Sequence, residues 1–135
     1  MKEWTLPAAI EKLPEVTAFV DEQLEACDCS MKAQMQIDLA VDEILTNIAS
    51  YAYAPGTGDM TIRVDVDPET RMATIVFLDS GVPYDPLQKA DPDTTLSADE
   101  RQIGGLGIFM VKKSVDDVKY EYKDGHNILR IMKNL

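Results

Sequence analysis

The sequence predicts an α+β protein, a two-layer sandwich with helices on one face of a mainly antiparallel, mixed sheet. Three segments carry apolar residues at helical spacing, and four short apolar segments form two pairs that are each joined by turn residues. Consecutive hairpins beside helices are typical of this class. A length of 135 residues suits one compact domain, so we expect residues 1–135 to form a single unit.

The first part of the chain predicts one strand and two helices. Residues 2–6 form a candidate strand, and Pro14 fits the first turn of a helix, where its missing N–H costs nothing. Ser30 is a candidate N-cap for a second helix, which runs to about Tyr53 and is ended by Pro55 and the glycines after it. The apolar stripe of the first helix comprises Val16, Phe19, Val20, Leu24 and Cys27.

Two hairpins are predicted in the remainder. Apolar and polar residues alternate over residues 60–67, which indicates a half-buried strand, and residues 72–78 return as a more apolar strand. Near the C-terminus, the alternating residues 118–122 and the apolar residues 128–133 form the second pair. The Asp124-Gly125 pair between them is a strong tight-turn signal.

Composition excludes several classes of function. A formal net charge of -11 argues against binding to nucleic acid or to an anionic membrane surface, both of which select clustered Lys and Arg. No apolar run reaches the roughly 18 residues of a membrane span, and no signal-peptide core follows Met1, so we expect a cytoplasmic protein. With one His and two Cys, the chain also lacks the ligands of a zinc site.

The second helix has a polar face that includes Glu43 and Asn47. These residues are four apart, so their side chains are neighbours. A carboxylate beside a carboxamide suits a site that holds water and a metal ion, because Glu can take a proton and Asn can offer a neutral oxygen ligand. A solvated polar face is the common alternative for an amphipathic helix, and the pair alone does not separate the two.

Asp79 follows the strand of residues 72–78 and precedes Gly81 and Pro83. A carboxylate at a strand end often caps a turn, and turn chemistry is the commoner explanation of this pattern. The functional alternative is an Asp that accepts a hydrogen bond from an exocyclic amine such as that of adenine. Gly81 would then allow a flat ring to approach the backbone closely.

A long segment and a glycine-rich helix start follow. Residues 84–103 show no consistent period, and loops of this length are usually functional lids or disordered segments. Residues 108–115 predict the third helix. Gly104-Gly105-Leu106-Gly107 opens it, and three glycines leave backbone N–H groups accessible at a positive helix end, which favours anion binding. A flexible hinge is the alternative, since neither a Walker A motif nor a full dinucleotide fingerprint is present.

Taken together, these motifs resemble a known superfamily. Glu43-x-x-x-Asn47, Asp79-x-Gly81-x-Pro83 and the glycine-rich segment match the N, G1 and G2 boxes of the histidine-kinase-like (Bergerat, GHKL) ATPases in order and spacing. The residues around them, 40–47 and 104–111, resemble the anti-sigma factor serine/threonine kinase branch. This resemblance covers nearly the whole chain and implies a Bergerat fold that binds ATP and Mg²⁺.

The resemblance also implies a role for each motif residue. Glu43 would be the general base that activates the attacking hydroxyl, and Asn47 would bind Mg²⁺. Asp79 would read the adenine amino group, with Gly81 lining the base pocket, while residues 84–103 would form the ATP lid. The phosphate-binding residues would be Gly104, Gly105, Leu106 and Gly107, with Arg101 as the nearest candidate for the γ-phosphate.

The function implied is an ATP-dependent kinase that phosphorylates a serine on a small anti-anti-sigma partner of the STAS class. Many such proteins bind a sigma factor as homodimers. The sequence departs from the family in two places: the His often found after the N box is missing, and Gln102 and Ile103 precede Gly104 where some members have Arg. The alternative is a non-catalytic module in which ATP orders the lid and the domain sequesters a partner. Retention of Glu43 favours the kinase, whereas the missing Arg beside Gly104 favours the non-catalytic module.

Overall fold

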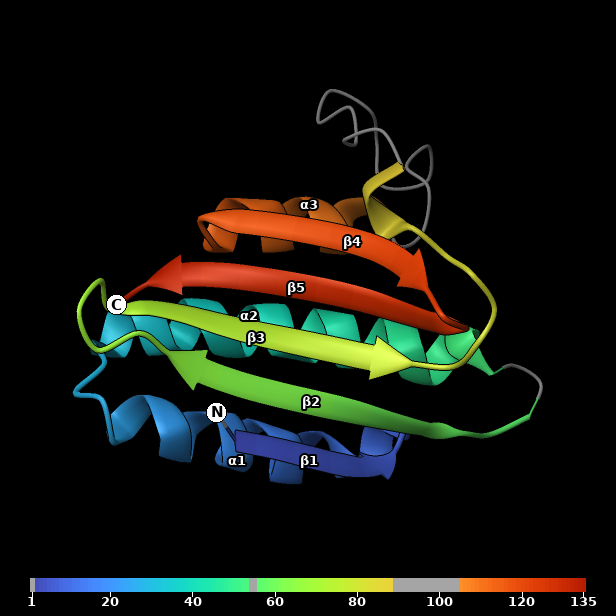
Figure 1. Ribbon diagram of the computed structural model, residues 1–135, viewed down its shortest axis with the longest axis horizontal. Coiled ribbons are helices and arrows are strands. Elements are labelled where there is room, and N and C mark those ends of the chain that lie inside the picture. Colours follow the sequence, from blue (N-terminus) through green and yellow to red (C-terminus); the bar gives the residue numbers. More distant parts are fainter. Residues whose placement is uncertain (1, 54–55, 89–104) are drawn as a thin grey trace.

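A computed structural model describes residues 2–53, 56–88 and 105–135, without the side chains of residues 88, 105 and 106. It confirms the α+β class: one five-stranded sheet carries its helices on one face (Figure 1). The strand order is β1-β2-β3-β5-β4, and all the strand pairings within the described ranges are antiparallel. The strands are β1 (Lys2–Pro7), β2 (Asp59–Val66), β3 (Met72–Asp79), β4 (Asp117–Lys123) and β5 (His126–Asn134).

Both predicted hairpins are present, and local turn chemistry explains each of them. Asp67 Oδ1 accepts hydrogen bonds from the backbone N–H of Glu69 and of Thr70, at 2.8 and 3.2 Å, and so closes the β2–β3 turn. In the β4–β5 turn, Asp124 and Gly125 have φ values of 54° and 80°. Two consecutive positive φ values define the hairpin turn that an Asp-Gly pair favours.

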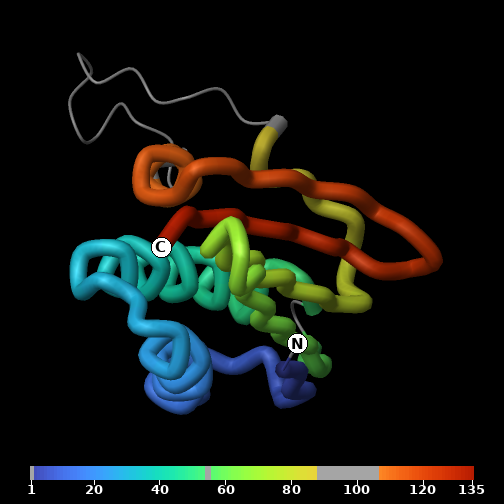
Figure 2. Tube along the Cα trace, turned by 60° about the vertical axis from the view of Figure 1, so that its left-hand side comes forward, coloured from blue at the N-terminus to red at the C-terminus, as the bar shows by residue number. Residues whose placement is uncertain are grey.

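Within the described ranges, three α-helices form the second layer: α1 (Leu13–Glu25), α2 (Met31–Asn47) and α3 (Gly105–Ser114). Figure 2 shows them on the same side of the sheet. The Oγ of Ser30 accepts a hydrogen bond from the Ala33 N–H at 3.2 Å, so the predicted N-cap of α2 is confirmed. No helix in the described ranges combines the length and hydropathy needed to span a bilayer.

The second helix differs from its prediction at its C-terminal end. It remains helical almost to Tyr53, but its last five residues, Ile48–Ala52, form a π-helical turn. Such wider turns are rare and occur frequently at functional sites. This one lies beside the end of β3, so it shapes the pocket described below.

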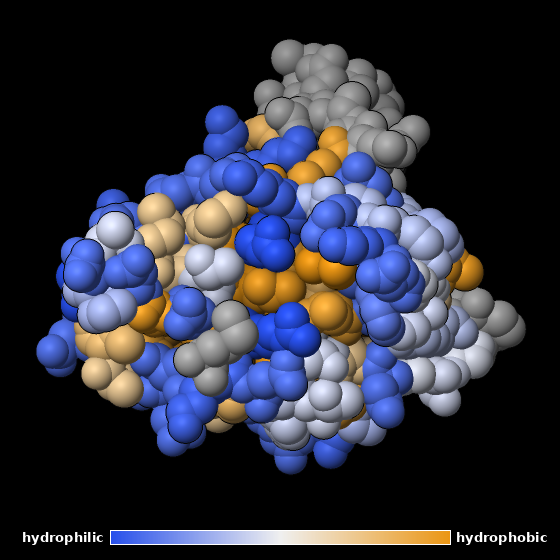
Figure 3. Space-filling model, in the orientation of Figure 1, coloured by the Kyte–Doolittle hydropathy of each residue, from blue (hydrophilic) through white to orange (hydrophobic). Residues whose placement is uncertain are grey.

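The core lies between the helices and the sheet. Alternate residues of β2, namely Met60, Ile62 and Val64, are buried against the helices, as the sequence pattern predicts. The opposite face of the sheet carries a strip of apolar side chains among hydrophilic ones (Figure 3). Val76, Leu78, Ile128 and Met132 belong to this strip, which explains why β3 is apolar on both faces. The α2 contribution to the core comprises Ala33, Ile37, Ala40, Val41, Ile44 and Leu45.

Candidate functional site

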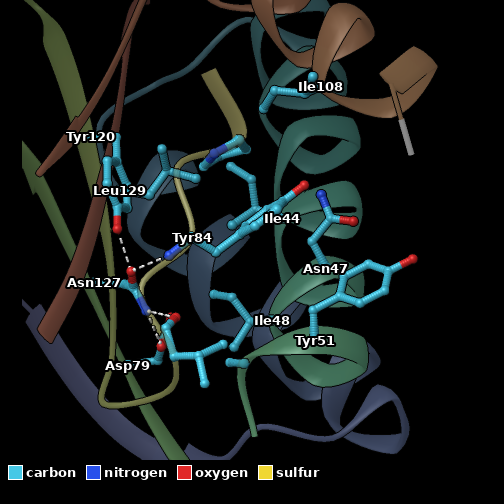
Figure 4. Close-up of a pocket in the computed structure, with 13 residues that line it drawn as sticks. Ile44, Asn47, Ile48, Tyr51, Asp79, Tyr84, Ile108, Tyr120, Asn127 and Leu129 are labelled. Atoms are coloured by element: carbon cyan, nitrogen blue, oxygen red, sulfur yellow. Dashed lines mark hydrogen bonds between the residues drawn. The ribbon is translucent and has the colours of Figure 1, made fainter. Parts of the chain in front are cut away.

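A pocket lies between the C-terminal end of α2, the ends of β3 and β5, and the segment that follows β3 (Figure 4). It contains about 490 Å³ of empty space, part of which is open solvent. Its wall is mostly apolar with a few convergent polar groups, which is typical of small-molecule sites. The helix contributes Asn47 and Tyr51, the sheet contributes Asp79 and Asn127, and the segment after β3 contributes Val82 and Tyr84.

Asp79 is the buried carboxylate of this pocket, with only 7% of its surface exposed. Its Oδ1 accepts a hydrogen bond from the Gly81 N–H and another from Asn127 Nδ2, both at 2.9 Å. The turn-capping interpretation of Asp79 is therefore correct for one oxygen. Its Oδ2 accepts no hydrogen bond from the described residues and remains for a ligand, so the two interpretations are compatible.

Gly81 lets the end of β3 pack onto the π-helical turn. A Cβ on Gly81 would overlap the backbone carbonyl of Ala52. That carbonyl accepts a hydrogen bond from the Val82 N–H at 3.0 Å, which satisfies a helix-end acceptor. The phenol oxygen of Tyr53 adds a second link, because it accepts a hydrogen bond from the Ser80 N–H at 2.7 Å. Close backbone packing is thus the observed role of Gly81, and Val82 forms the adjacent pocket wall.

Asn127 is a site residue that the sequence analysis did not identify. It lies directly opposite Asp79 in the β3–β5 register and is 6% exposed. Its Nδ2 donates hydrogen bonds to Asp79 Oδ1 and to the Val82 carbonyl, both at 2.9 Å. Its Oδ1 accepts from the Tyr84 N–H at 3.1 Å and from the Tyr120 hydroxyl (Figure 4). The available signal was a polar residue at an inward-facing position of an alternating strand.

Glu43 and Asn47 lie on the side of α2 that faces α3. The Asn47 side chain lines the pocket, whereas Glu43, one turn earlier, lies against the first turns of α3. A Cβ on Gly107 would overlap the Glu43 carboxylate, so glycine at this position allows the two helices to approach around that carboxylate. Burial raises the pKa of Glu43, and the neighbouring charge of Asp42 raises it further.

The remaining predicted site residues are placed only in part. Gly105 and Leu106 begin α3, while Gly104 and Arg101 lie outside the described residues. Most of the predicted lid also lies outside them; only residues 84–88 of the range 84–103 are described, and they include a short 3₁₀ turn. In the described part of α3, the positive N-terminal end of the helix lies beside the Glu43 carboxylate.

The residues present fit a nucleotide with its magnesium ion. The Asn47 carboxamide makes no hydrogen bond to the described residues, and Gly107 carries no side chain of its own at the start of α3. The described part of the chain has no group of three or more His, Cys, Asp or Glu side chains suited to a metal. Mg²⁺ that accompanies a nucleotide takes ligands from phosphates and water, so one or two protein oxygens suffice.

Comparison with known proteins agrees with this geometry. Residues 6–133 match the family described as the histidine kinase-like ATPase domain. The chain is 30% identical over 102 residues to the serine/threonine-protein kinase BtrW of Bordetella bronchiseptica, covering 76% of this chain and 71% of that protein. It is also 30% identical over 104 residues to the serine-protein kinase RsbW of Listeria monocytogenes, with 74% of this chain and 66% of the relative covered.

A third relative is the anti-sigma F factor of Clostridium acetobutylicum, which is 28% identical over 97 residues, with 72% of this chain and 66% of the relative covered. The chain thus spans just under two thirds of the length of the RsbW and anti-sigma F relatives. The family match extends over nearly all of the chain, including every motif of the pocket. This chain therefore belongs to the histidine kinase-like ATPase domain family, among relatives that are serine-protein kinases and anti-sigma factors.

Proposed function

We propose that this protein binds Mg-ATP between α2, α3 and the sheet, and transfers the γ-phosphate to a serine of a STAS-type anti-anti-sigma protein. The observation that carries the proposal is the contact between the Glu43 carboxylate and the Gly107 backbone at the start of α3. This contact brings a candidate base to a helix N-terminus that favours phosphate. One helical turn further along α2, Asn47 lines the adjoining pocket that contains Asp79.

At the base end, Asp79 Oδ2 would accept a hydrogen bond from the adenine amino group. The opposite oxygen is already held by two donors, so the carboxylate has little freedom to turn away. Apolar surface from Ile48, Val82 and Leu129 lines the same pocket and would cover the faces of the ring. A guanine base presents a carbonyl in place of the amine, and two acceptors facing each other would disfavour it.

At the phosphate end, the backbone at the start of α3 would bind phosphate oxygens, and Asn47 would bind the metal ion. Bound Mg²⁺ supplies neutralisation of the phosphate charge. Glu43 would accept the proton of the serine hydroxyl at a carboxylate oxygen. The pKa of Glu43 is raised toward the working pH, and a carboxylate with such a pKa is a more effective general base.

The partners follow from the relatives. One relative is an anti-sigma F factor and others are serine-protein kinases. We therefore propose that this chain binds a sigma factor as one partner and phosphorylates a STAS protein as the other. ATP would switch the chain between these two partners. We expect the chain to act in the cytoplasm and as a homodimer. Nucleic acid and anionic membrane surfaces are disfavoured as partners by the net charge of -11.

The test uses the purified chain, γ-labelled ATP and each STAS-domain protein encoded in the same genome. Label on a serine of one of these proteins is the expected result. Glu43→Gln should lower the transfer rate on the order of 100-fold or more while ATP affinity stays within a few-fold. Glu22→Gln, an exposed change on α1, is the matched control and should leave both unchanged.

The outcomes separate the proposal from its alternative. ATP binding by the wild type without transfer to any STAS protein would favour the non-catalytic module, in which ATP regulates sequestration of a partner. Transfer at the wild-type rate by Glu43→Gln would remove Glu43 as the base. Absence of ATP binding by the wild type would overturn both functions.

A further inference from the structure

Asn127 makes four hydrogen bonds inside the candidate pocket. Its two Nδ2 hydrogens go to Asp79 Oδ1 and to the Val82 carbonyl, and its Oδ1 accepts from the Tyr84 N–H and from the Tyr120 hydroxyl. A carboxamide offers two donor hydrogens and two acceptor lone pairs, so this side chain is fully used. Each of its four partners belongs to the pocket lining (Figure 4).

Only a carboxamide satisfies this set of partners. The Asp79 carboxylate and the Val82 carbonyl are acceptors and need donors, whereas the Tyr84 N–H and the Tyr120 hydroxyl need an acceptor. Aspartate at position 127 would place an acceptor against two acceptors, and leucine would leave all four groups without this partner. Position 127 therefore requires both the amino group and the oxygen of a carboxamide.

The arrangement fixes which oxygen of Asp79 is available. Asn127 and the Gly81 N–H both hold Oδ1, so rotation of the carboxylate would break two hydrogen bonds to a charged group. Oδ2 is then the oxygen left for a base. The same carboxamide also sets the positions of Val82 and Tyr84, which form the pocket wall beside that oxygen.

We infer that Asn127 is a positioning residue that determines base specificity: it orients Asp79 toward an exocyclic amine and ties the segment after β3 to the same point. This inference rests on the proposed nucleotide site. It differs from a purely structural role, because it requires that loss of the carboxamide abolish discrimination between bases. A purely structural role would weaken every nucleotide equally.

The experiment compares ATP with purine riboside 5′-triphosphate, which lacks the exocyclic amine, by calorimetric titration of the intact chain. The wild type should prefer ATP on the order of tenfold, the range for a hydrogen bond to a charged group. Asn127→Leu and Asn127→Asp should bring that ratio close to one. Asn134→Leu is the matched control: this carboxamide lies on the same strand, and its Nδ2 donates to the Thr70 carbonyl at 3.1 Å, outside the pocket.

Tyr120→Phe provides a milder variant that tests the inference should the Asn127 variants not fold. It removes one of the four hydrogen bonds that fix the Asn127 carboxamide and so loosens the hold of that carboxamide on Asp79, which should lower the ratio roughly twofold to threefold. The inference is overturned if Asn127→Leu or Asn127→Asp gives a folded circular-dichroism spectrum and still prefers ATP over purine riboside 5′-triphosphate as strongly as the wild type does. An undiminished preference for ATP in Tyr120→Phe overturns it as well. A wild type that binds both triphosphates equally is a different failure, because it removes the proposed reading of adenine by Asp79.

Discussion

Glu43 and Gly107 lie so close together that a Cβ on Gly107 would overlap the Glu43 carboxylate. The two residues come from α2 and α3, whose packing brings the candidate base to the start of the glycine-rich helix. The atoms that a Cβ would meet are the far end of a flexible side chain, with no backbone among them. A larger residue at position 107 would therefore displace the carboxylate without breaking the fold.

Gly107→Ala should accordingly separate activity from stability. Alanine favours a helix interior by roughly 0.5–1 kcal/mol over glycine, which offsets the local crowding, so the free energy of unfolding should change by less than about 1 kcal/mol. Phosphoryl transfer should fall at least about tenfold, because the base is displaced. Urea denaturation and single-turnover transfer measure the two quantities. Gly125→Asn, at φ 80° in the β4–β5 turn, where a Cβ would meet no atom within 4 Å, is the control and should keep the wild-type rate.

Gly81→Ala should show the opposite behaviour. Its Cβ would meet the Ala52 backbone carbonyl and Cβ, which cannot move without shifting the π-helical turn. Overpacking of this kind costs about 1–3 kcal/mol, so urea denaturation should report a clear loss in the free energy of unfolding. An unfolding midpoint equal to that of the wild type would show that the π-helical turn shifts at little cost in free energy. Close packing against Ala52 would then not be the reason for glycine at position 81.

The pH dependence of phosphoryl transfer should show whether Glu43 is the general base, because a change at the neighbouring Asp42 should shift it. Only the carboxylate form of Glu43 can accept a proton, so the rate should rise with pH through its raised pKa and fall on the acid side. Asp42→Asn removes a charge that contributes to this raised pKa, so the acid limb should move to lower pH. Transfer rates over pH 5–8 at saturating ATP test this shift. If the acid limb of the pH–rate profile lies at the same pH in Asp42→Asn as in the wild type, a group other than Glu43 controls the rate.

Much of the fold could be predicted because it depends on local patterns. The Asp124-Gly125 turn and the Ser30 cap are short-range features, and both are present in the structure. The spacing of Glu43 and Asn47 likewise placed them on one helix face. The contact of Glu43 with α3 could not be predicted, since it depends on how two helices distant in sequence pack. Asn127 was missed because alternation identifies inward positions but not the partners that lie there.

Asp79→Asn should change nucleotide preference in addition to affinity. The new carboxamide oxygen can still accept from Gly81 and Asn127, so an amino group would replace Oδ2 and face the base. ATP binding should weaken by about 1–3 kcal/mol, because two donors would oppose each other, whereas GTP should gain relative to ATP. Calorimetric titration with both nucleotides tests this. Asp59→Asn, an exposed change on β2, is the control, and an unchanged ATP-to-GTP ratio in Asp79→Asn would contradict the assignment.

Asp21 and Asp38 form a carboxylate pair away from the pocket. Asp21 on α1 and Asp38 on α2 each have a buried Oδ1 without a hydrogen-bond partner among the described residues. Burial raises the pKa of Asp38 from 3.8 to about 7, and Asp21 and Glu25 contribute to the rise. A proton on Asp38 supplies the donor that two carboxylates lack, so folding takes up a proton between these values.

The sign of the effect on stability follows from that uptake. A folded-state pKa above the unfolded value means that the contribution of Asp38 is fully present below about pH 4 and is lost as pH rises through about 7. Asp38→Asn should therefore raise the free energy of unfolding more at pH 8 than at pH 5, by about 1 kcal/mol, because solvent around a half-buried pair screens most of the shift. Urea denaturation at the two pH values measures the difference, with the exposed Glu22→Gln as control. Equal stabilisation at both pH values would show that Asp38 does not take up the proton on folding.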